Sequence, residues 1–465
     1  MKLVKKILSV AVACASTQVA AVDVTDAQDR VTIPDGDNLT ITETGSLDTS
    51  GLGGASTARA FDSTIQFIDN RGSIFTGNDG ITLFGTTVTG AITNSGSIAN
   101  LDTVVSNGIR LDDSDGVPTL VQGGILNSGT IEMRATTCDN DTVCYGAGIA
   151  VLGLTEISAP AGVDGIANSG NITSFGADGA IDAGILIAAQ ANNDGSAPGA
   201  DQSPNVNGIL SNSGTILSAG TGIDIRGATV QSILNSEVTF PDGSVQRGLI
   251  SASAGAGISI TNTYLDDNFT VFGTFAGVTN VGSISNFGDI VGSDFGILIS
   301  DTGTRVGNIF NEGSIRSIGP GNGAAIEVLN GAVLADITNS EGGFILGSLG
   351  PAIIIDNSTI ESTISNLGQI CSVDDAQVCR TTESSIIVRG SNVSSIFNDT
   401  NGLISGSSAI DVEDGSTIND ISNFGTLTGI DLAVSVLSGS TVTNINNNGN
   451  GAVAVINSGN ALLSK

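Results

Sequence analysis

The chain contains no histidine and no tryptophan, and aromatic residues make up only 4% of its 465 positions. Lysine is almost absent as well, because Lys465 is the only lysine beyond the first six residues. These absences exclude Ser-His and Cys-His nucleophiles, P-loop phosphate sites, lysine Schiff bases and histidine-ligated metals. Any catalytic chemistry in this chain would therefore depend on carboxylates.

Basic residues are scarce in general. Lys and Arg number 15 against 46 Asp and Glu, which gives a formal net charge of −31. Such an acidic surface repels nucleic acid and anionic lipid, so we exclude both as partners. It suits a secreted protein that has to stay soluble, and it could hold Ca²⁺ loosely. No later stretch has the length and apolarity of a transmembrane helix, so we expect no membrane insertion by this chain itself.

The first 21 residues have the organisation of a secretory signal peptide. Three lysines near the start precede a short apolar run over 7–15, and small residues allow cleavage after Ala21. The alternative is a lipoprotein lipidated at Cys14, but Ala11 stands where such a signal has a large aliphatic residue. We predict a signal peptide over 1–21 and an exported protein.

Four cysteines follow the signal as two close pairs, Cys138 with Cys144 and Cys371 with Cys379. Metal sites are the rival explanation, but the spacing is not CxxC and no histidine could complete a site. An exported chain with an even number of cysteines favours disulfides. Each disulfide would close a short loop and staple a local hairpin.

One phrase, Ile-x-Asn-x-Gly-x-Ile, recurs along the chain, for example over 92–98, 125–131 and 166–172. Successive Asn positions lie 24 residues apart from Asn70 to Asn94 and 23 apart from Asn212 to Asn235. Repetition at such an interval indicates a stack of equivalent units whose number sets the chain length.

Each unit holds three short strand signals. One ends at the Ile before the Asn, one starts at the Ile after the Gly, and one has the form Gly/Ala-Ile-x-Ile/Val/Leu, as at Ile109 and Leu111. Alternating β-branched residues of this kind turn one face inward. We predict an all-β fold, a right-handed parallel β-helix (solenoid) of about 13 coils with three strands per coil, since parallel crossovers are almost always right-handed.

The Asn of the repeat is expected at a tight turn, where its side chain tolerates a left-handed backbone and bonds neighbouring peptide groups. The Gly two residues later is expected to take a positive φ. Stacked Asn side chains can form a ladder along the axis. The predicted ladder comprises Asn70, Asn94, Asn127, Asn168, Asn212, Asn286, Asn311, Asn339, Asn366, Asn398, Asn423 and Asn447.

The predicted organisation has three parts: the signal peptide over 1–21, an N-terminal capping segment over 22–60, and the β-helix over 61–465. A cap is expected because the end of such a stack exposes strand edges. Insertions in the coils are where a rigid scaffold commonly presents binding residues. We place these inserted loops at 110–124, 134–148, 188–208, 235–256 and 371–385.

These loops differ in character. The stretch over 188–208 is rich in small and polar residues and is expected to be flexible rather than adhesive. The two loops with cysteine pairs carry Asp139, Asp141, Asp374 and Asp375 and are the better recognition candidates. Tolerated surface insertion is the alternative for all of them.

The signal peptide, the early sequence TIPDGDNLTITETGSL over 32–47 and the tandem coils together resemble the passenger region of bacterial autotransporters. The resemblance extends over essentially the whole exported chain. It implies a β-helix displayed on the outer surface of a Gram-negative cell, and it implies little about activity.

One feature of that family is missing. Its members carry a C-terminal β-barrel, which needs many alternating strands with aromatic girdles. After residue 300 the aromatic residues are Phe310, Phe344, Phe397 and Phe424, and the repeat runs to the end. We expect no barrel within this chain; an outer-membrane barrel would follow Lys465 if the native protein is longer.

Three acidic clusters are candidates for carboxylate chemistry: 112–115, 266–267 and 411–414. A glycosidase needs two carboxylates that face one sugar bond, and no cluster lies in a recognisable hydrolase motif. We therefore assign no catalytic residue and no cofactor. Asp113 and Asp115 resemble the start of a Ca²⁺ loop but lack the later ligands, so they are only a weak metal candidate.

The sequence thus favours an exported cell-surface or extracellular β-helix with an adhesive or structural role. Its expected partner is a glycan or a protein on another cell or host surface, bound through the loops and a long flat face. The alternative is a β-helical polysaccharide-degrading enzyme, a glycosidase or lyase, that uses paired Asp and Glu.

Overall fold

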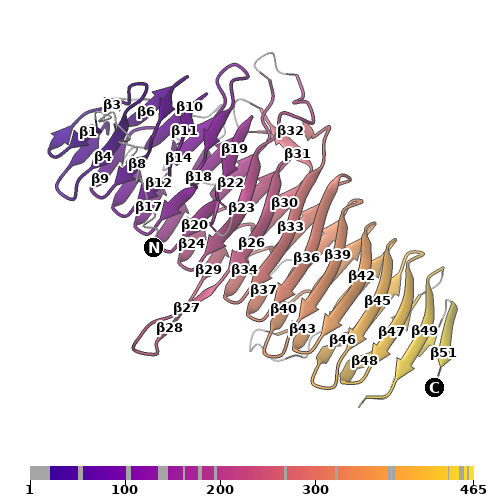
Figure 1. The fold of residues 1–465 in the computed structure, drawn as a ribbon. Coiled ribbons are helices and arrows are strands. Elements are labelled where there is room, and N and C mark those ends of the chain that lie inside the picture. Colours follow the sequence, from indigo (N-terminus) through magenta and orange to yellow (C-terminus); the bar gives the residue numbers. More distant parts are fainter. Residues whose placement is uncertain are drawn as a thin grey trace, which may run out of the picture.

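The computed structural model describes residues 21–50, 56–100, 106–134, 145–160, 163–175, 181–192, 196–266, 270–319, 323–374, 379, 383–437, 439–449, 455–457 and 460–464. The predicted signal peptide, apart from Ala21, lies outside these residues. All regular structure in the described part is β-strand, arranged as a long stack (Figure 1). No described helix is long and apolar enough to cross a membrane.

Three strand rows run along the stack. The first row ends at the repeat Asn in most turns and forms a sheet of its own. Its strands are β1 (Ala21–Val24), β4 (Asn38–Ile41), β7 (Thr64–Ile65), β8 (Ile68–Asn70), β11 (Thr87–Val88), β12 (Ile92–Asn94), β15 (Thr119–Val121), β16 (Ile125–Asn127), β19 (Thr155–Ser158), β20 (Ile166–Asn168), β23 (Asn205–Asn212), β26 (Thr229–Asn235), β33 (Thr279–Asn286), β36 (Thr304–Asn311), β39 (Val333–Asn339), β42 (Thr359–Asn366), β45 (Asn392–Asn398), β47 (Thr417–Asn423), β49 (Thr441–Asn447) and β51 (Asn460–Ser464).

The second row starts near the Ile after the repeat Gly. Its strands are β2 (Ala27–Gln28), β5 (Ser46–Asp48), β9 (Ser73–Thr76), β13 (Ser97–Asn100), β17 (Thr130–Arg134), β21 (Asn171–Phe175), β24 (Thr215–Ser218), β29 (Leu249–Ala252), β34 (Asp289–Gly292), β37 (Ser314–Ser317), β40 (Phe344–Ser348) and β43 (Gln369–Val373).

The third row carries the Ile-x-Ile signal. Its strands are β3 (Val31–Thr32), β6 (Ala58–Phe61), β10 (Ile81–Phe84), β14 (Ser106–Asp112), β18 (Tyr145–Leu152), β22 (Ile181–Ala188), β25 (Thr221–Arg226), β30 (Ala256–Thr261), β35 (Phe295–Ser300), β38 (Ile326–Leu329), β41 (Ile353–Asp356), β44 (Ile386–Arg389) and β50 (Val455–Asn457). Near the C-terminal end, β46 (Leu403–Glu413) and β48 (Thr426–Val436) run through the second and third rows without a break.

Within each row, a strand pairs in parallel with the equivalent strands of the turns before and after it. Asn94 pairs with Asn127 in the first row, and Ile109 pairs with Ile149 in the third. The repeat phrase therefore occupies the same place in every turn. This arrangement confirms the predicted all-β parallel β-helix with three strands per turn; its right hand stays a prediction from crossover geometry.

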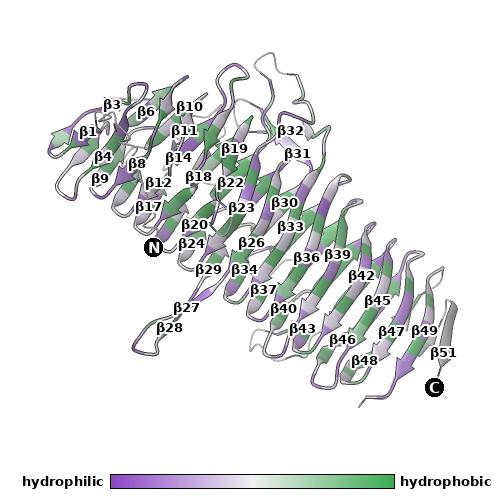
Figure 2. Ribbon diagram, viewed as in Figure 1, coloured by the Kyte–Doolittle hydropathy of each residue, from purple (hydrophilic) through white to green (hydrophobic). Residues whose placement is uncertain are grey.

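The core consists of stacked aliphatic side chains. Ile92, Ile98 and Ile109, one from each row of neighbouring turns, are wholly buried. Their partners in the next turn, Ile125 and Ile131 among them, are buried equally. Apolar and polar positions consequently alternate along the strands (Figure 2), because successive side chains point to opposite faces of a sheet.

The asparagines form a continuous hydrogen-bonded ladder. In every turn the side-chain Nδ2 donates to Oδ1 of the next Asn, at 2.6 to 2.9 Å, from Asn70 to Asn447. All twelve predicted residues take part, and Asn235 joins them between Asn212 and Asn286. The ladder prediction did not include Asn235, where Glu237 stands in place of the repeat Gly.

The ladder stops at Asn70 on its N-terminal side. Ile41 occupies the equivalent position in the preceding turn, so Oδ1 of Asn70 is buried with no hydrogen-bond partner among the described residues. All the amides of the ladder point the same way, and one end therefore has an unused acceptor. In the described part of the chain, first-row strands β1 and β4 precede the thirteen ladder turns and β51 follows them, so the stack is somewhat longer than the predicted length of about 13 coils.

The expected left-handed turn at the Asn is wrong. Neither the ladder asparagines nor the Gly two residues later has a positive φ. Left-handed residues lie instead after the third row, for example Gly85, Asn330 and Asn357. Gly129 is required for space, since a Cβ there would lie 2.1 Å from the carbonyl oxygen of Gly96 in the preceding turn.

Substitution of Gly129 by alanine is expected to lower the free energy of unfolding by about 1–3 kcal/mol, because the backbones of two turns must separate to admit the Cβ. Chemical denaturation monitored by circular dichroism measures the change. The matched control is Ser128→Ala, an exposed neighbour with an expected effect within about 0.5 kcal/mol. Equal stability of the two variants would contradict this account of the glycine.

The segment predicted to cap the stack is itself part of the stack. β1 pairs in parallel with β4, and β4 with β8, in register with the later first-row strands. β5 likewise joins the second row through β9. The predicted boundary at residue 61 therefore marks no change of architecture, since the coil spacing begins before the repeat phrase becomes recognisable.

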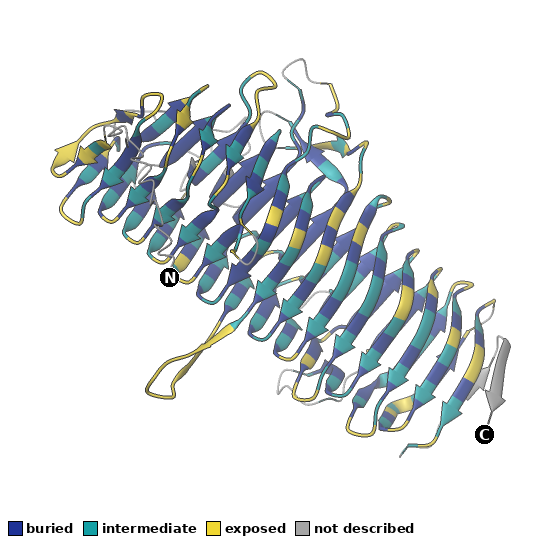
Figure 3. Ribbon diagram, in the orientation of Figure 1, coloured by how far each residue is buried: buried dark blue, intermediate teal, exposed yellow. Residues whose placement is uncertain are grey.

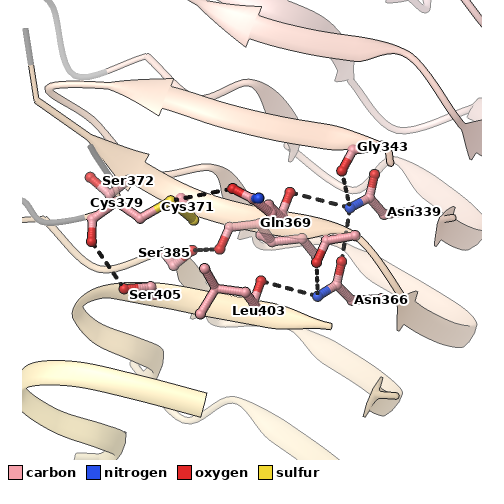
Figure 4. The surroundings of a disulfide bond; sticks show 12 residues. Asn339, Gly343, Asn366, Gln369, Cys371, Ser372, Cys379, Ser385, Leu403 and Ser405 are labelled. Atoms are coloured by element: carbon pink, nitrogen blue, oxygen red, sulfur yellow. Dashed lines mark hydrogen bonds between the residues drawn. A yellow bond between two sulfur atoms is a disulfide. The ribbon is translucent and has the colours of Figure 1, made fainter. Parts of the chain in front are cut away.

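The predicted disulfide between Cys371 and Cys379 is present, with Cα atoms 5.3 Å apart (Figure 4). Cys371 lies in β43 and is buried in a small cluster outside the main core, which includes Leu346 and Val373. The bond holds Cys379 against this cluster. The other predicted pair, Cys138 with Cys144, lies outside the described residues.

Candidate functional site

Two insertions from different turns form a lobe on the side of the stack (Figure 1). One follows β22, and its described parts are 189–192 and 196–204. The other lies between β30 and β33, with described parts 262–266 and 270–278, and contains the antiparallel hairpin of β31 (Thr263–Leu265) and β32 (Val271–Thr274). We call these four segments together the lateral lobe.

Backbone hydrogen bonds join the two insertions. The amide of Ala191 donates to the carbonyl of Leu265 at 2.7 Å, and the amide of Leu265 donates to the carbonyl of Ala189 at 3.0 Å. Ala189, Ala191, Tyr264 and Phe275 form a small buried cluster between them. The lateral lobe is therefore one packed unit, although its two parts are far apart in the sequence.

The lateral lobe is seated on the outer face of the third row. Leu265 is buried in a cluster with Ala150 and Leu186, which point outward from β18 and β22. Leu152 and three further alanines, Ala147, Ala183 and Ala188, complete the apolar set on this face. Small side chains there allow the lobe to approach the strands closely.

A cavity of about 590 Å³ lies between the stack and the lateral lobe. This volume is in the range of small-molecule binding sites. The stack contributes Phe84, Arg110, Asp112, Asp113, Asp115, Gly116, Gly153 and Leu154, and the lobe contributes Gln190, Ala191, Asn192 and Gln202. The lining thus combines carboxylates, amides, one guanidinium and one aromatic ring.

Asp112 is the most buried charged residue of this cavity, with 5% of its surface exposed. Its Oδ2 accepts a hydrogen bond from Arg110 at 2.7 Å, and its Oδ1 accepts one from the backbone amide of Asp113. Burial raises the pKa of Asp112 to about 6, although Arg110 opposes the shift. At neutral pH the carboxyl is largely ionised and paired.

Arg110 holds the neighbouring groups in place. Its guanidinium lies 5.1 Å from the centre of the Phe84 ring and 3.8 Å from Oδ2 of the buried Asp79. Phe84 in turn stacks on Phe61 of the preceding turn, with ring centres 5.5 Å apart. The cavity wall is therefore fixed by contacts across three turns.

The weak Ca²⁺ candidate falls at this cavity. Asp113 uses one carboxylate oxygen to accept from the amide of Gly116 and the other to accept from the amide of Leu154. Asp115 has a left-handed backbone at the tip of the same turn. No group of three potential metal-ligating side chains occurs among the described residues, and a calcium site here stays a hypothesis.

The other two acidic clusters lie elsewhere. Asp266 closes the β31–β32 connection, where its Oδ1 accepts from the amide of Thr270 at 2.7 Å, and its neighbour 267 lies outside the described residues. Asp411 and Glu413 lie on β46, and Glu413 is paired with Arg389. The three predicted clusters therefore belong to three separate places on the molecule.

A half-buried carboxyl on β38, that of Glu327, gives the fold a pH dependence. Burial raises the pKa of Glu327 to about 7 and the charge of Asp356 adds to the shift, while Arg389 opposes it. The native state then holds a proton that the unfolded state releases above about 4.5. The contribution to stability is complete below that pH and is lost as the pH rises towards 7.

We expect Glu327→Gln to stabilise the protein at pH 8 by about 1–3 kcal/mol and to change little at pH 4. The reason is that glutamine avoids the cost of ionising a half-buried carboxyl. Thermal unfolding of both proteins across this pH range gives the difference. The exposed Glu312→Gln is the control, and a Glu327→Gln curve parallel to that of the parent protein would refute the assignment.

The predicted insertions have different outcomes. The 235–256 region contains the hairpin of β27 (Glu237–Thr239) and β28 (Val245–Arg247), which extends from the rod with every residue exposed (Figure 3). The 110–124 turn and the described part of 188–208 both line the cavity. Asp139, Asp141 and Asp375, on the loops favoured for recognition, lie outside the described residues, whereas Asp374 follows β43.

The sequence analysis missed the second half of the lateral lobe. A single insertion was inferred between Asn235 and Asn286, but this interval contains two hairpins. Four aromatic residues within 264–275 were the available signal, in a chain with only 4% aromatics. Two of them, Tyr264 and Phe275, are buried and form part of the apolar interior of the lobe.

The segment expected to be flexible, 188–208, supplies one wall of the cavity through its described residues. Gln202 accepts a hydrogen bond from the amide of Gly199, and Asn192 donates to Ser196 and to the carbonyl of Ala197. Comparison of the chain with family models, curated proteins and solved structures gives no match.

Proposed function

We propose that this protein is an exported cell-surface or extracellular β-helix, similar to an autotransporter passenger, which binds a glycan through the cavity beside the lateral lobe. Adhesion or a structural role on the cell surface follows from such binding. The signal-like N-terminus and the acidic composition support export. The same adhesive role could instead be served by a protein ligand that binds the long face of the rod.

The observation that carries this proposal is the cavity itself. Its carboxylates and amides can bond sugar hydroxyls, and the edge of the Phe84 ring with Leu154 and Ala191 offers apolar contact to the carbon-bound hydrogens of a sugar ring. A volume of about 590 Å³ accommodates a short oligosaccharide. The stacked strands hold this lining in place, as an adhesive scaffold requires.

A glycan array probed with the purified chain tests the proposal. Gln190→Ala and Phe84→Ala are expected to weaken the bound signal by about tenfold each, through a lost hydrogen bond and a lost apolar contact. Thr239→Ala, on the exposed β27–β28 hairpin, serves as the control and should leave binding unchanged. If all three variants bind as well as the parent chain, the glycan site is not this cavity.

Cell fractionation tests the export half of the proposal. A blot with an antibody against the β-helix should find the protein in the outer membrane or the medium. A species well above 46.3 kDa in the outer membrane would indicate an anchoring segment beyond Lys465. A cytoplasmic protein that keeps its first 21 residues would contradict export.

A polysaccharide-degrading enzyme is the second candidate, and the raised pKa of Asp112 favours it, since a general acid needs such a shift. However, both oxygens of Asp112 already accept hydrogen bonds, from Arg110 and from the backbone of Asp113. Incubation of the chain with polysaccharides and a reducing-end assay distinguishes the two candidates. Turnover that Asp112→Asn abolishes would replace the adhesive role with an enzymatic one.

A further inference from the structure

We propose that the cavity beside the lateral lobe selects saccharides that carry a protonated amine, such as unacetylated hexosamines, over neutral and acidic sugars. This inference rests on the proposed glycan binding and names the ligand class of the same site. It is carried by the charges and the hydrogen-bonding groups that surround the cavity.

Carboxylates outnumber cations in the cavity wall. Asp112, Asp113 and Asp115 line it, whereas Arg110 is the one basic side chain among the described lining residues. The guanidinium of Arg110 is already paired with Asp112 at 2.7 Å and has Asp79 at 3.8 Å. The wall therefore keeps a net negative charge that a ligand can meet.

The remainder of the molecule strengthens this field. The formal net charge of −31 comes from 46 acidic against 15 basic residues. A cleft with walls of low dielectric constant focuses such a field on its interior. Uronate, sialate or phosphate groups would be repelled, and an ammonium group would be attracted.

The uncharged polar residues of the lining, Gln190, Asn192 and Gln202, suit the hydroxyl groups of a sugar. Asn192 uses its amide nitrogen within the loop, and Gln202 uses its amide oxygen to bind Gly199. The amide oxygen of Asn192, the amide nitrogen of Gln202 and both ends of the Gln190 amide have no hydrogen bond to another described residue and can meet ligand hydroxyls. Amides that combine acceptors and donors match hydroxyl groups, which both donate and accept.

The placement of Asp115 gives the amine a position. Asp112 is buried and Asp113 is half-buried, so both lie deeper in the cavity wall than Asp115. Asp115 lies at the exposed tip of the same turn, next to Gly116, which also lines the cavity. An ammonium group at the mouth would lie near Asp115 while the sugar ring extends towards Phe84 and Gln190.

The test measures binding of three soluble oligosaccharides of equal length by calorimetry at neutral pH and low salt: a glucosamine oligomer, its N-acetylated form and a galacturonate oligomer. We expect the glucosamine oligomer to bind about tenfold more tightly than the acetylated one, with the preference weakened by salt. The galacturonate oligomer should bind least.

Variants of the full chain assign the preference to the cavity. Asp115→Asn should reduce the preference for the amine by about threefold or more, because it removes one charge at the mouth. Asp242→Asn, a turn aspartate on the distant β27–β28 hairpin, is the control and should keep the full preference. Gln190→Ala should weaken all bound oligosaccharides alike.

Each outcome decides between the two proposals. Equal binding of the amine and acetylated oligomers, lost in Gln190→Ala, would overturn the amine preference and support glycan binding in the cavity. Tighter binding of the galacturonate oligomer would also overturn the preference. If none of the three oligomers binds, the glycan-binding cavity fails, and the inference about its ligand class fails with it.

Discussion

Substitution of Asn286 by alanine is expected to lower the free energy of unfolding by about 3–5 kcal/mol. Asn286 accepts from Asn235 at 2.8 Å and donates to Asn311 at 2.8 Å and to the carbonyl of Ser314 at 3.1 Å. The change removes one acceptor of Asn235, which keeps its bonds to the carbonyls of Gly248 and Asp289. It also takes the ladder donor from Oδ1 of the buried Asn311 and one donor from the carbonyl of Ser314. Each incompletely bonded group costs about 1–3 kcal/mol.

The end of the ladder supplies the matched comparison. Asn70 is as buried as Asn286, but it donates to Asn94 at 2.6 Å and its Oδ1 accepts no hydrogen bond from a described residue, since Ile41 precedes it in the stack. Asn70→Ala therefore deprives one ladder partner rather than two, and its cost should be about half. Denaturant unfolding gives both values, and equal losses would show that the ladder bonds do not act as a chain.

Hydrogen exchange shows which turns lose amide protection in Asn286→Ala. Each turn of a solenoid contacts mainly its immediate neighbours, so the loss of Asn286 should expose the amides of the adjacent turns first. Faster exchange is expected around Ser314 and Asp289, whose carbonyls accept from ladder amides. Exchange that rises evenly along the whole rod would contradict a local role for each Asn.

The ladder and the rows were predictable because they depend on local spacing. Ile92, Asn94, Gly96 and Ile98 recur together, and each has one place in the turn, so a repeated phrase indicates the register of the whole stack. The interior needs no more information than the alternation of apolar residues. Even where the phrase changes, as at Asn235, the stacking of neighbouring turns keeps the position.

The role of the glycine was not predictable in the same way. The repeat phrase indicates that glycine is needed at positions 96 and 129. It does not show whether the position needs the conformational freedom of glycine or its lack of a side chain. A Cβ at Gly129 would lie 2.1 Å from the oxygen of Gly96, which identifies lack of space as the reason. This distance depends on how closely two turns stack. A sequence pattern within one turn does not contain that distance.

The candidate site was predictable only in part. The cluster at Asp112, Asp113 and Asp115 was identified as acidic, and the 188–208 segment was identified as an insertion. Their meeting depends on the docking of Leu265 against Ala150, a contact between residues more than a hundred positions apart. Neither segment carries a periodic signal that would reveal this contact.

Arg226→Leu is expected to lower the free energy of unfolding by about 3–5 kcal/mol, because it leaves a buried charge without its partner. Asp224 is wholly buried, and its Oδ2 lies 2.8 Å from Nε of Arg226. Its Oδ1 has no hydrogen-bond partner among the described residues. Thermal and denaturant unfolding give the loss, and Arg305→Leu is the control.

Arg305 makes a comparable pair with Glu361 at 2.6 Å, but both side chains are more than 40% exposed. Solvent screens such a pair, so its loss should cost about 0–1 kcal/mol. The contrast between the two arginines separates burial from simple charge pairing. Similar losses from both substitutions would mean that the burial of Asp224 does not decide its energy.

Arg226 also donates to the hydroxyl of Thr263 at 3.3 Å, at the base of the lateral lobe. Arg226→Leu should therefore speed hydrogen exchange in β31 and β32 beyond what global destabilisation explains. Because the lobe supplies one wall of the cavity, ligand binding should weaken together with this protection. If hydrogen exchange in β31 and β32 is unchanged while the protein is destabilised, the ion pair stabilises the stack and not the lateral lobe.

Replacement of both members of the pair removes the buried charges together. Leu186, the neighbour of Asp224 in the preceding turn, shows that this outward position accepts leucine beneath the lobe. The double variant Asp224→Leu/Arg226→Leu should recover most of the lost stability, and it could exceed the parent protein by about 1–4 kcal/mol. Recovery of stability without recovery of lobe protection would mean that the ion pair positions the lateral lobe, and with it the cavity, at a cost to the fold.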